Sequence, residues 1–252
     1  MKESKLSKWQ YASYGAPALP LSMNGLILAT YLPAVYADSE GFGLALGTMG
    51  FIVMISRIFD GVTDPIVGYW SDRVTSKWGR RKPFIVIGLP VWVLGVWFLW
   101  VPPLEFEEVS FLGFEFNNGY PWLLFALILF YAGSTIKDVP YSAWGAELSS
   151  KYNERTLVMS WREGFSVTGS LIGALTPAII IFFGYTKPTD AVYFLSIFIV
   201  LLSPIFIFNS LWSVPEYEVK ETRKERIPIL EGLKYVWENE PYRKLVIIFL
   251  FS

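Results

Sequence analysis

The sequence predicts an all-α membrane protein with six spanning helices and the start of a seventh. Apolar residues make up 53 % of its 252 positions and charged residues only 17 %, whereas about a quarter of the residues are charged in soluble domains. Six apolar segments approach or exceed the roughly 20 residues that a helix needs to cross a bilayer. Lysine and arginine gather in alternate connections, as they do on the cytoplasmic side of membrane proteins.

The expected spans divide the chain into three parts. They cover residues 11–36, 44–70, 84–101, 122–144, 157–184 and 191–214. We therefore expect a six-helix bundle over residues 1–215, a cytoplasmic linker over residues 216–241 and the truncated start of a seventh helix over residues 242–252. Within the linker, Leu230, Leu233 and Trp237 recur at helical spacing, which favours an amphipathic helix on the membrane surface over a partner-binding helix.

The distribution of charge sets the orientation. The cations of one side are Lys2, Lys5, Lys8, Arg73, Lys77, Arg80, Arg81, Lys82, Lys151, Arg155, Lys220, Arg223, Lys224, Arg226 and Lys234. The connections on the other side contain Lys187 and several carboxylates. The positive side is cytoplasmic by the positive-inside rule, so we expect a multi-pass protein of the cell (inner) membrane with a cytoplasmic N-terminus. The first span is too long and too rich in proline for a signal peptide.

Missing residue types exclude several kinds of site. Without cysteine there is no disulfide, thiol nucleophile or thiolate metal site. Without histidine there is no imidazole base and no histidine metal site. The net charge of −1 provides no basic excess for a nucleic-acid partner. We expect a protein that is not an enzyme and whose partners are the lipid bilayer and small solutes.

The second span carries three charges on one face. On a helix, Arg57, Asp60 and Asp64 fall within a sector of about 60°. Each costs roughly 2.5–3.5 kcal/mol at the bilayer centre, so this face must meet water, protein or an ion. Arg57 can form a helix-internal ion pair with one carboxylate, which leaves the other to a cation or proton. We favour such a site over a structural network. Pro65 also frees a backbone carbonyl as a further oxygen ligand.

Two further spans contain charges that allow two interpretations each. In the fourth, Lys137 either extends along its stem towards water or forms a tethered cation beside Asp138 and the ion site. In the fifth, Arg162 and Glu163 form an interfacial pair, or Arg162 binds a polar substrate or Asp138. The two charges of Lys137 and Asp138 lie about 100° apart on a helix and are not expected to share one direction.

The basic connection and its surroundings resemble a known transporter family. Gly68, Asp72 and Arg73, followed by Gly79, Arg80 and Arg81, resemble the helix II–III loop signature of the major facilitator superfamily. Together with the residues from 57 to 83 and from 138 to 156, they resemble the glycoside–pentoside–hexuronide:cation symporters, also called the sodium/melibiose symporter family. The similarity extends over the N-terminal half of such a protein.

The resemblance implies a fold and a set of roles. It implies a helical bundle with substrate bound near the midplane between two six-helix halves. It implies Na⁺, Li⁺ or H⁺ as the coupling ion, with no other cofactor. The resemblance implies Asp60, Asp64, Thr135 and Asp138 as cation ligands, to which Thr63 adds an oxygen, and it implies Arg162 and Asp138 as substrate residues. Lys137 departs from the family pattern; we count it, together with Asn24, among the candidate substrate residues. We expect Asp72, Arg73, Arg80 and Arg81 to form the cytoplasmic gate. In the gate, the arginines pair with acidic groups when that side is closed.

Three hypotheses follow. The first is the N-terminal half of a cation-coupled symporter for a sugar or related solute, which transports with a C-terminal half or a second copy of the chain. The first span has no charge and offers only Asn24 as a strongly polar amide, so a lipid-like substrate is an alternative. The second is a transport-incompetent fragment or membrane scaffold. The third, an intramembrane aspartyl enzyme, is disfavoured because Asp60 and Asp64 share one helix.

Overall fold

The computed structural model describes residues 6–216, apart from 38–41, 75, 103–104, 112 and 186, together with residues 238–241 and 244. The chain divides into two units, Met1–Tyr217 and Glu218–Ser252. In the second unit, Lys244 forms an ion pair with Glu240 at 2.9 Å. The predicted amphipathic helix around Leu230 and the seventh span from Leu245 lie outside the described residues.

Long apolar helices build the first unit. The first span consists of α1 (Lys8–Gly15) and α2 (Ala18–Tyr36), and the following spans are α3 (Leu46–Arg73), α4 (Lys82–Trp100), α5 (Gly119–Glu147), α6 (Tyr152–Phe182) and α7 (Pro188–Ser213). Six segments of the described residues are long and apolar enough to cross a membrane. This confirms the predicted fold class, with each predicted span matched by one helix or, in the first case, by a broken one.

Proline shapes these helices in a regular way. Each span has a proline inside it: Pro33, Pro65, Pro90, Pro140, Pro177 and Pro204. A proline removes one backbone hydrogen bond of the helix, and neighbouring helices make this tolerable in a membrane protein. Pro17 separates α1 from α2. At the start of α1, Ser7 and Gln10 form a reciprocal capping box.

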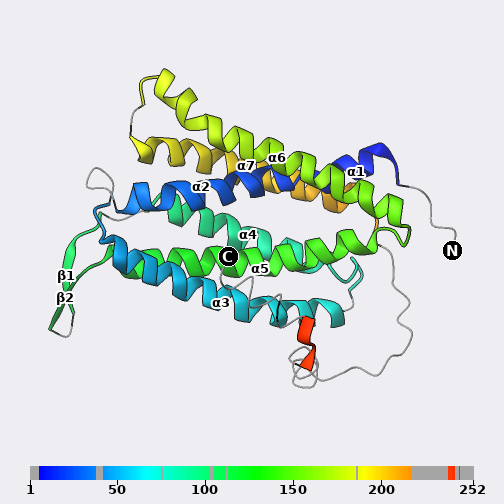
Figure 1. The fold of residues 1–252 in the computed structure, drawn as a ribbon, viewed down its shortest axis with the longest axis horizontal. Helices are drawn as coiled ribbons and strands as arrows, with labels where there is room; N and C mark the ends of the chain where they lie inside the picture. The colour runs from blue at the N-terminus through cyan, green and yellow to red at the C-terminus, as the bar shows by residue number, and fades with distance from the viewer. Residues whose placement is uncertain are drawn as a thin grey trace. The chain divides into compact units, whose positions relative to one another are not determined.

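The helices run side by side along the length of the unit (Figure 1). In that view α6 and α7 lie on one side, α3 and α5 on the other, and α2 and α4 between them. The main packing pairs are α4 with α5, α2 with α6 and α3 with α5. In its most apolar stretch, 44 % of the residues of α5 are buried, but only 17 % of those of α3 and of α6. These last two helices therefore present most of their surface outwards.

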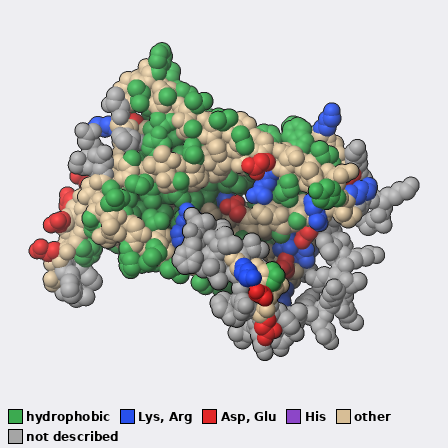
Figure 2. Space-filling view, viewed as in Figure 1, with side chains coloured by type: hydrophobic (Ala, Val, Ile, Leu, Met, Phe, Trp, Pro, Cys, Tyr) green, Lys and Arg blue, Asp and Glu red, His purple; other side chains and the backbone are tan. Residues whose placement is uncertain are grey.

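The two ends of the first unit differ in chemistry. One end, which we call the basic end, carries α1, loop 74–81 and the last residues of α7. The other, the hairpin end, carries β1 (Glu108–Phe111) and β2 (Phe114–Asn117), which pair antiparallel with Val109 opposite Phe116. The sequence did not predict this hairpin. Phe106 at its base packs edge-on against Phe42 beside Tyr36. Figure 2 shows a small group of charged side chains on the otherwise largely apolar middle of one face.

Candidate cation and substrate site

Oxygen atoms from α3 and α5 meet in the middle of the first unit. Asp60 lies halfway along the 28-residue α3. Thr135 on α5 donates a hydrogen bond to Asp60 Oδ1 at 2.9 Å, and the hydroxyls of Thr63 and Thr135 are 3.4 Å apart. Thr135 is 2 % exposed. Three of the predicted cation ligands therefore come together from two helices.

Asp64 lies one turn further along α3 and is half-buried. In the described part of the chain it makes no hydrogen bond or ion pair. Since Asp60 and Asp64 are four residues apart, they are neighbours on one helix face. No group of three carboxylates suited to a metal ion occurs among the described residues. The set consists of two carboxylates and two hydroxyls, and such hard oxygen ligands suit a hard cation.

The predicted helix-internal ion pair of Arg57 is wrong. The guanidinium of Arg57 lies 5.5 Å from the ring centroid of Tyr131 on α5, and no carboxylate of the described residues forms an ion pair with it. Asp60 is instead held by Thr135. Helical spacing brings Arg57 and Asp60 to the same face, but the long arginine side chain extends towards an aromatic ring, which attracts cations.

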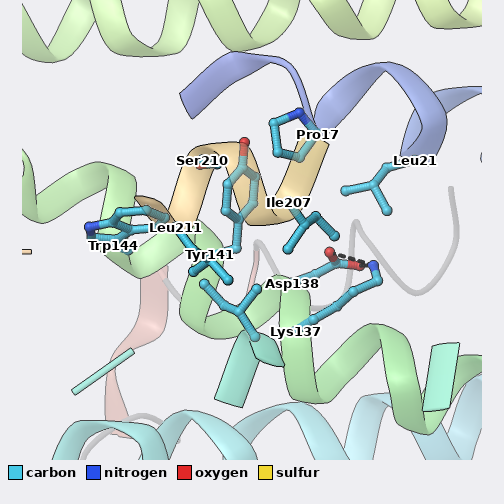
Figure 3. A pocket seen from close by; sticks show the side chains of 10 residues that line it. Pro17, Leu21, Lys137, Asp138, Tyr141, Trp144, Ile207, Ser210 and Leu211 are labelled. Atoms are coloured by element: carbon cyan, nitrogen blue, oxygen red, sulfur yellow. Dashed lines mark hydrogen bonds and ion pairs between the residues drawn. The ribbon is translucent and has the colours of Figure 1, made fainter. Parts of the chain in front are cut away.

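Lys137 is a tethered cation and does not extend to water. Its ammonium is 2.7 and 2.8 Å from the two carboxylate oxygens of Asp138, as the dashed lines in Figure 3 show. The Lys137 side chain is only 1 % exposed, that of Asp138 41 %. The expectation that the two charges diverge is wrong, because the flexible stem of Lys137 curves back to its neighbour. Both residues line a cavity of about 10 Å³, room for roughly one water.

Arg162 lies on α6 and is half-buried. It is ten residues past the first residue of α6, which corresponds to about 15 Å along the helix. Its guanidinium is 5.5 Å from the ring centroid of Tyr141. The Tyr141 ring stacks on Tyr14 at 4.8 Å, and each hydroxyl donates to the backbone carbonyl of the other residue. The ring contact with Tyr141 favours a position of Arg162 inside the bundle over an interfacial one, and its direct pairing with Asp138 is not seen in the described residues.

Asn24 is held by a core tryptophan. It is 1 % exposed, and its side-chain oxygen accepts a hydrogen bond from the indole of Trp100 at 3.3 Å. The substrate-binding role of Asn24 stays a prediction. A buried amide needs a partner, and a tryptophan from α4 provides it.

Charges at the basic end are densely paired. Arg81 contacts Asp72 at 2.5 Å and Glu147 at 2.8 Å, and Arg80 contacts the same oxygen of Glu147 at 2.7 Å. The Arg81 side chain is 5 % exposed. Burial alone lowers the pKa of Arg81, but the hydrogen bond and attraction of Glu147, with the attraction of Asp72, outweigh it and raise that pKa. Asp72, Arg80 and Arg81 are thus brought together as predicted.

Arg73 takes a separate position at this end. Its guanidinium lies 3.2 Å from the ring centroid of Tyr69 and donates to the Tyr69 carbonyl at 3.2 Å. The interaction is local to the last turns of α3.

Sequence comparison places the chain in a family. Residues 13–252 match the family model described as "MFS/sugar transport protein". The chain belongs to this family. The resemblance to cation symporters is thereby confirmed, and the first unit is the integral, multi-pass membrane part of a transporter-family protein.

Three relatives give this family membership more detail. The chain is 32 % identical to an uncharacterized symporter of Synechocystis sp. over 85 % of this chain and 38 % of the relative. It is 23 % identical to the inner membrane symporter YicJ of Escherichia coli over 100 % of this chain and 52 % of the relative. It is 25 % identical to the sodium-dependent lysophosphatidylcholine symporter 1 of Mus musculus over 100 % of this chain and 51 % of the relative. The chain thus spans about half the length, or less, of these relatives. Their names are those of transporters, which fits a role other than catalysis.

Sequence reasoning assigned no role to two acidic residues of this family member. Glu147 ends α5 and receives both arginines. Glu216 accepts hydrogen bonds from the backbone N–H of Arg80 at 2.6 Å and of Arg81 at 2.7 Å, at the start of α4. A Cβ on Gly79, whose φ is +106°, would overlap the Glu216 carboxylate. A carboxylate is favourable at a helix start, but no local pattern in the sequence relates Glu216 to the start of α4, 136 positions from Arg80.

Proposed function

We propose that this chain forms the half of a cation-coupled symporter that binds the coupling ion, a monovalent cation or proton, between α3 and α5. The observation that supports it is the meeting of Asp60, Thr63 and Thr135, with Asp64 one turn away and without a hydrogen bond or ion pair to any described residue. Carboxylates in the middle of a spanning helix cost free energy unless a ligand compensates them. A bound monovalent cation supplies that compensation.

Counting charges supports a single cation. The Lys137 ammonium already neutralises Asp138. Asp60 and Asp64 then share only Arg57 as a basic residue on their own stretch of α3, and its guanidinium faces a tyrosine ring. One positive charge is therefore missing from this group, which one Na⁺, Li⁺ or proton provides.

The substrate would bind to residues of α5 and α6. Arg162 sits over Tyr141, which follows Asp138 by one turn of α5. An arginine fork and a half-exposed carboxylate offer donors and acceptors to the hydroxyls of a sugar or related solute. Cation binding raises the affinity for this substrate, and substrate raises the affinity for the cation by the same factor.

Transport needs a second helical bundle. The site residues on α3 and α6 lie on the two least buried helices, so we propose that a C-terminal half or a second copy of the chain covers this face and rocks against it. The network of Asp72, Arg80, Arg81 and Glu147 then acts as the cytoplasmic gate, with the N-terminus on that side of the cell membrane and Arg73 at the gate's edge.

A lipid-like solute is a second candidate substrate. A groove of about 720 Å³ lies beside α6 and α7, lined by Met23, Ile172, Thr176, Ile179, Ile180, Phe183, Tyr185, Phe194, Leu195, Ile197, Phe198 and Leu201. Its lining is almost entirely apolar, which suits a hydrocarbon chain and not a sugar. One relative is named a lysophosphatidylcholine symporter.

The experiment is a thermal unfolding titration of the purified chain in detergent. Na⁺ or Li⁺ replaces choline at constant ionic strength, in the wild type and in Asp60→Asn, Asp64→Asn and Asp190→Asn. Asp190 lies in the first turn of α7, away from the site, and serves as the matched control.

Saturable stabilisation in the wild type and in Asp190→Asn, and its absence in both site variants, is the expected result. A scaffold whose charges only hold helices together responds to none of the cations in any variant. Adding a sugar or a lysolipid at saturating Na⁺ then separates the two substrate candidates by which one stabilises the chain further.

A further inference from the structure

The two charges of the Lys137–Asp138 pair are buried to very different extents. Lys137 is 1 % exposed and Asp138 41 %, measured on the side chains. The ammonium therefore depends almost entirely on the carboxylate for its stabilisation, with the ring of Trp92 at 4.3 Å as a second partner. The carboxylate remains accessible to another ligand.

Lys137 is held in place by its surroundings. Its backbone lies against Gly88 on α4 so closely that a Cβ on Gly88 would be 2.7 Å from the Lys137 nitrogen. The Lys137 ammonium lies over the ring of Trp92. It reaches Asp138 beside the small cavity (Figure 3). The ammonium thus occupies a fixed position on the carboxylate.

Asp138 shares a face of α5 with the cation site. It lies three residues after Thr135, so the two side chains are neighbours on the helix. Thr135 in turn contacts Asp60 on α3. A cation bound at Asp138 would therefore be a neighbour of one bound at Asp60 and Asp64.

We propose that Lys137 acts as a built-in cation that takes the place of a second coupling ion at Asp138. In the wild type the tethered ammonium occupies this carboxylate, so one cation binds per chain. Lys137 accordingly determines how many cations bind to one chain. The claim about ion number rests on the proposed function, whereas the occupation of Asp138 by Lys137 is tested independently of it.

The experiment replaces Lys137 either alone or together with Asp138. Lys137→Gln, Lys137→Arg and Lys137→Gln/Asp138→Asn are made both in the wild type and in an Asp60→Asn/Asp64→Asn background, which lacks the proposed primary site. Thermal stability in detergent is measured with Na⁺ or Li⁺ against choline at constant ionic strength. If the proposed function is wrong, Na⁺ and Li⁺ do not stabilise the wild type. The comparison of the Lys137 variants in the Asp60→Asn/Asp64→Asn background is still valid in that case.

In the Asp60→Asn/Asp64→Asn background, we expect Lys137→Gln to gain a saturable Na⁺ or Li⁺ stabilisation that the starting chain lacks. Lys137→Arg keeps the positive charge and gains none. Adding Asp138→Asn to Lys137→Gln removes the gain while keeping the chain folded, since no charge is then left unpaired.

Two results overturn the proposal. One is a Lys137→Gln chain whose stability is as independent of the cation as that of its parent. The other is a gain that persists when Asp138 is also replaced. If Lys137→Gln unfolds in choline, recovery of the fold in Na⁺ supports the proposal, and failure to recover in either cation, while the double substitution folds, overturns it.

Discussion

The gate network at the basic end and the polar group in the middle of α3 use the same residue types in opposite ways. At the basic end, Arg81 contacts the carboxylates of Asp72 and Glu147, and Arg80 contacts the same Glu147 oxygen. In the middle of α3, Asp60 has only a threonine hydroxyl, and Asp64 has no hydrogen bond or ion pair in the part of the chain that is described. Among the described residues, the charges at the basic end are paired within the fold, while those in the middle of α3 are left for the cation that we propose.

Replacing Glu147 by Ala has the largest expected effect on stability. It leaves the nearly buried Arg81 with the carboxylate of Asp72 and the hydroxyl of Ser71, and loss of one partner of a buried ion pair costs about 3 kcal/mol. A denaturant titration of the detergent-solubilised chain measures it. Glu163→Ala, at an exposed position of α6, is the control. Equal losses in the two variants contradict the importance of the gate network.

Replacing Glu216 by Ala has the second-largest expected effect on stability. The backbone N–H groups of Arg80 and Arg81 lose their acceptor, which costs about 1–2 kcal/mol at a helix start. The same titration measures it, with Glu115→Ala in the exposed hairpin as the matched control. A loss no larger than that of Glu115→Ala would show that the Glu216 contact is dispensable.

Replacing Thr135 by Val is expected to affect both the stability of the chain and its response to Na⁺. It removes the hydrogen bond to Asp60, at a cost of about 1 kcal/mol, and deletes a cation ligand. We expect the half-saturating Na⁺ concentration in thermal unfolding to rise several-fold. Thr168→Val removes a hydroxyl that bonds only to its own helix, at Gly164, and should leave the Na⁺ response unchanged. A Thr135→Val chain with wild-type Na⁺ response speaks against Thr135 as a ligand.

Replacing Asp64 by Asn has the smallest expected effect on stability in choline, within about 0.5 kcal/mol, because the carboxylate has no hydrogen bond or ion pair to lose among the described residues. The loss of stability in choline should therefore be much smaller for Asp64→Asn than for Glu147→Ala. If Asp64→Asn destabilises the chain in choline as much as Glu147→Ala does, Asp64 is a structural residue and the distinction between the two regions fails.

The sequence predicted the helices well because a spanning helix depends on a long apolar segment, a local property. It also selected Asp60, Thr63 and Thr135, which the structure brings together. The sequence did not predict the contacts that depend on the direction of a side chain. Helical spacing alone does not choose between Asp60 and a tyrosine ring for Arg57, and the flexible stem of Lys137 overrides the angle between neighbouring positions.

Long-range partners could not be predicted. The hydrogen bond between Asn24 and Trp100 of α4 joins residues that are 76 positions apart. Glu216 lies 135 positions from Arg81 in the sequence, and no local pattern relates them. The hairpin at residues 108–117 is short, and a two-stranded hairpin has little stability of its own, so its sequence pattern is weak.

The central claim is that one monovalent cation binds between α3 and α5. The most direct measurement is the binding of radioactive Na⁺ to the purified wild-type chain, with Asp64→Asn and Asp190→Asn measured in parallel. The account predicts one ion per chain at saturation in the wild type and Asp190→Asn, and none in Asp64→Asn. Binding that is absent from the folded wild type, or that Asp64→Asn retains in full, would contradict it.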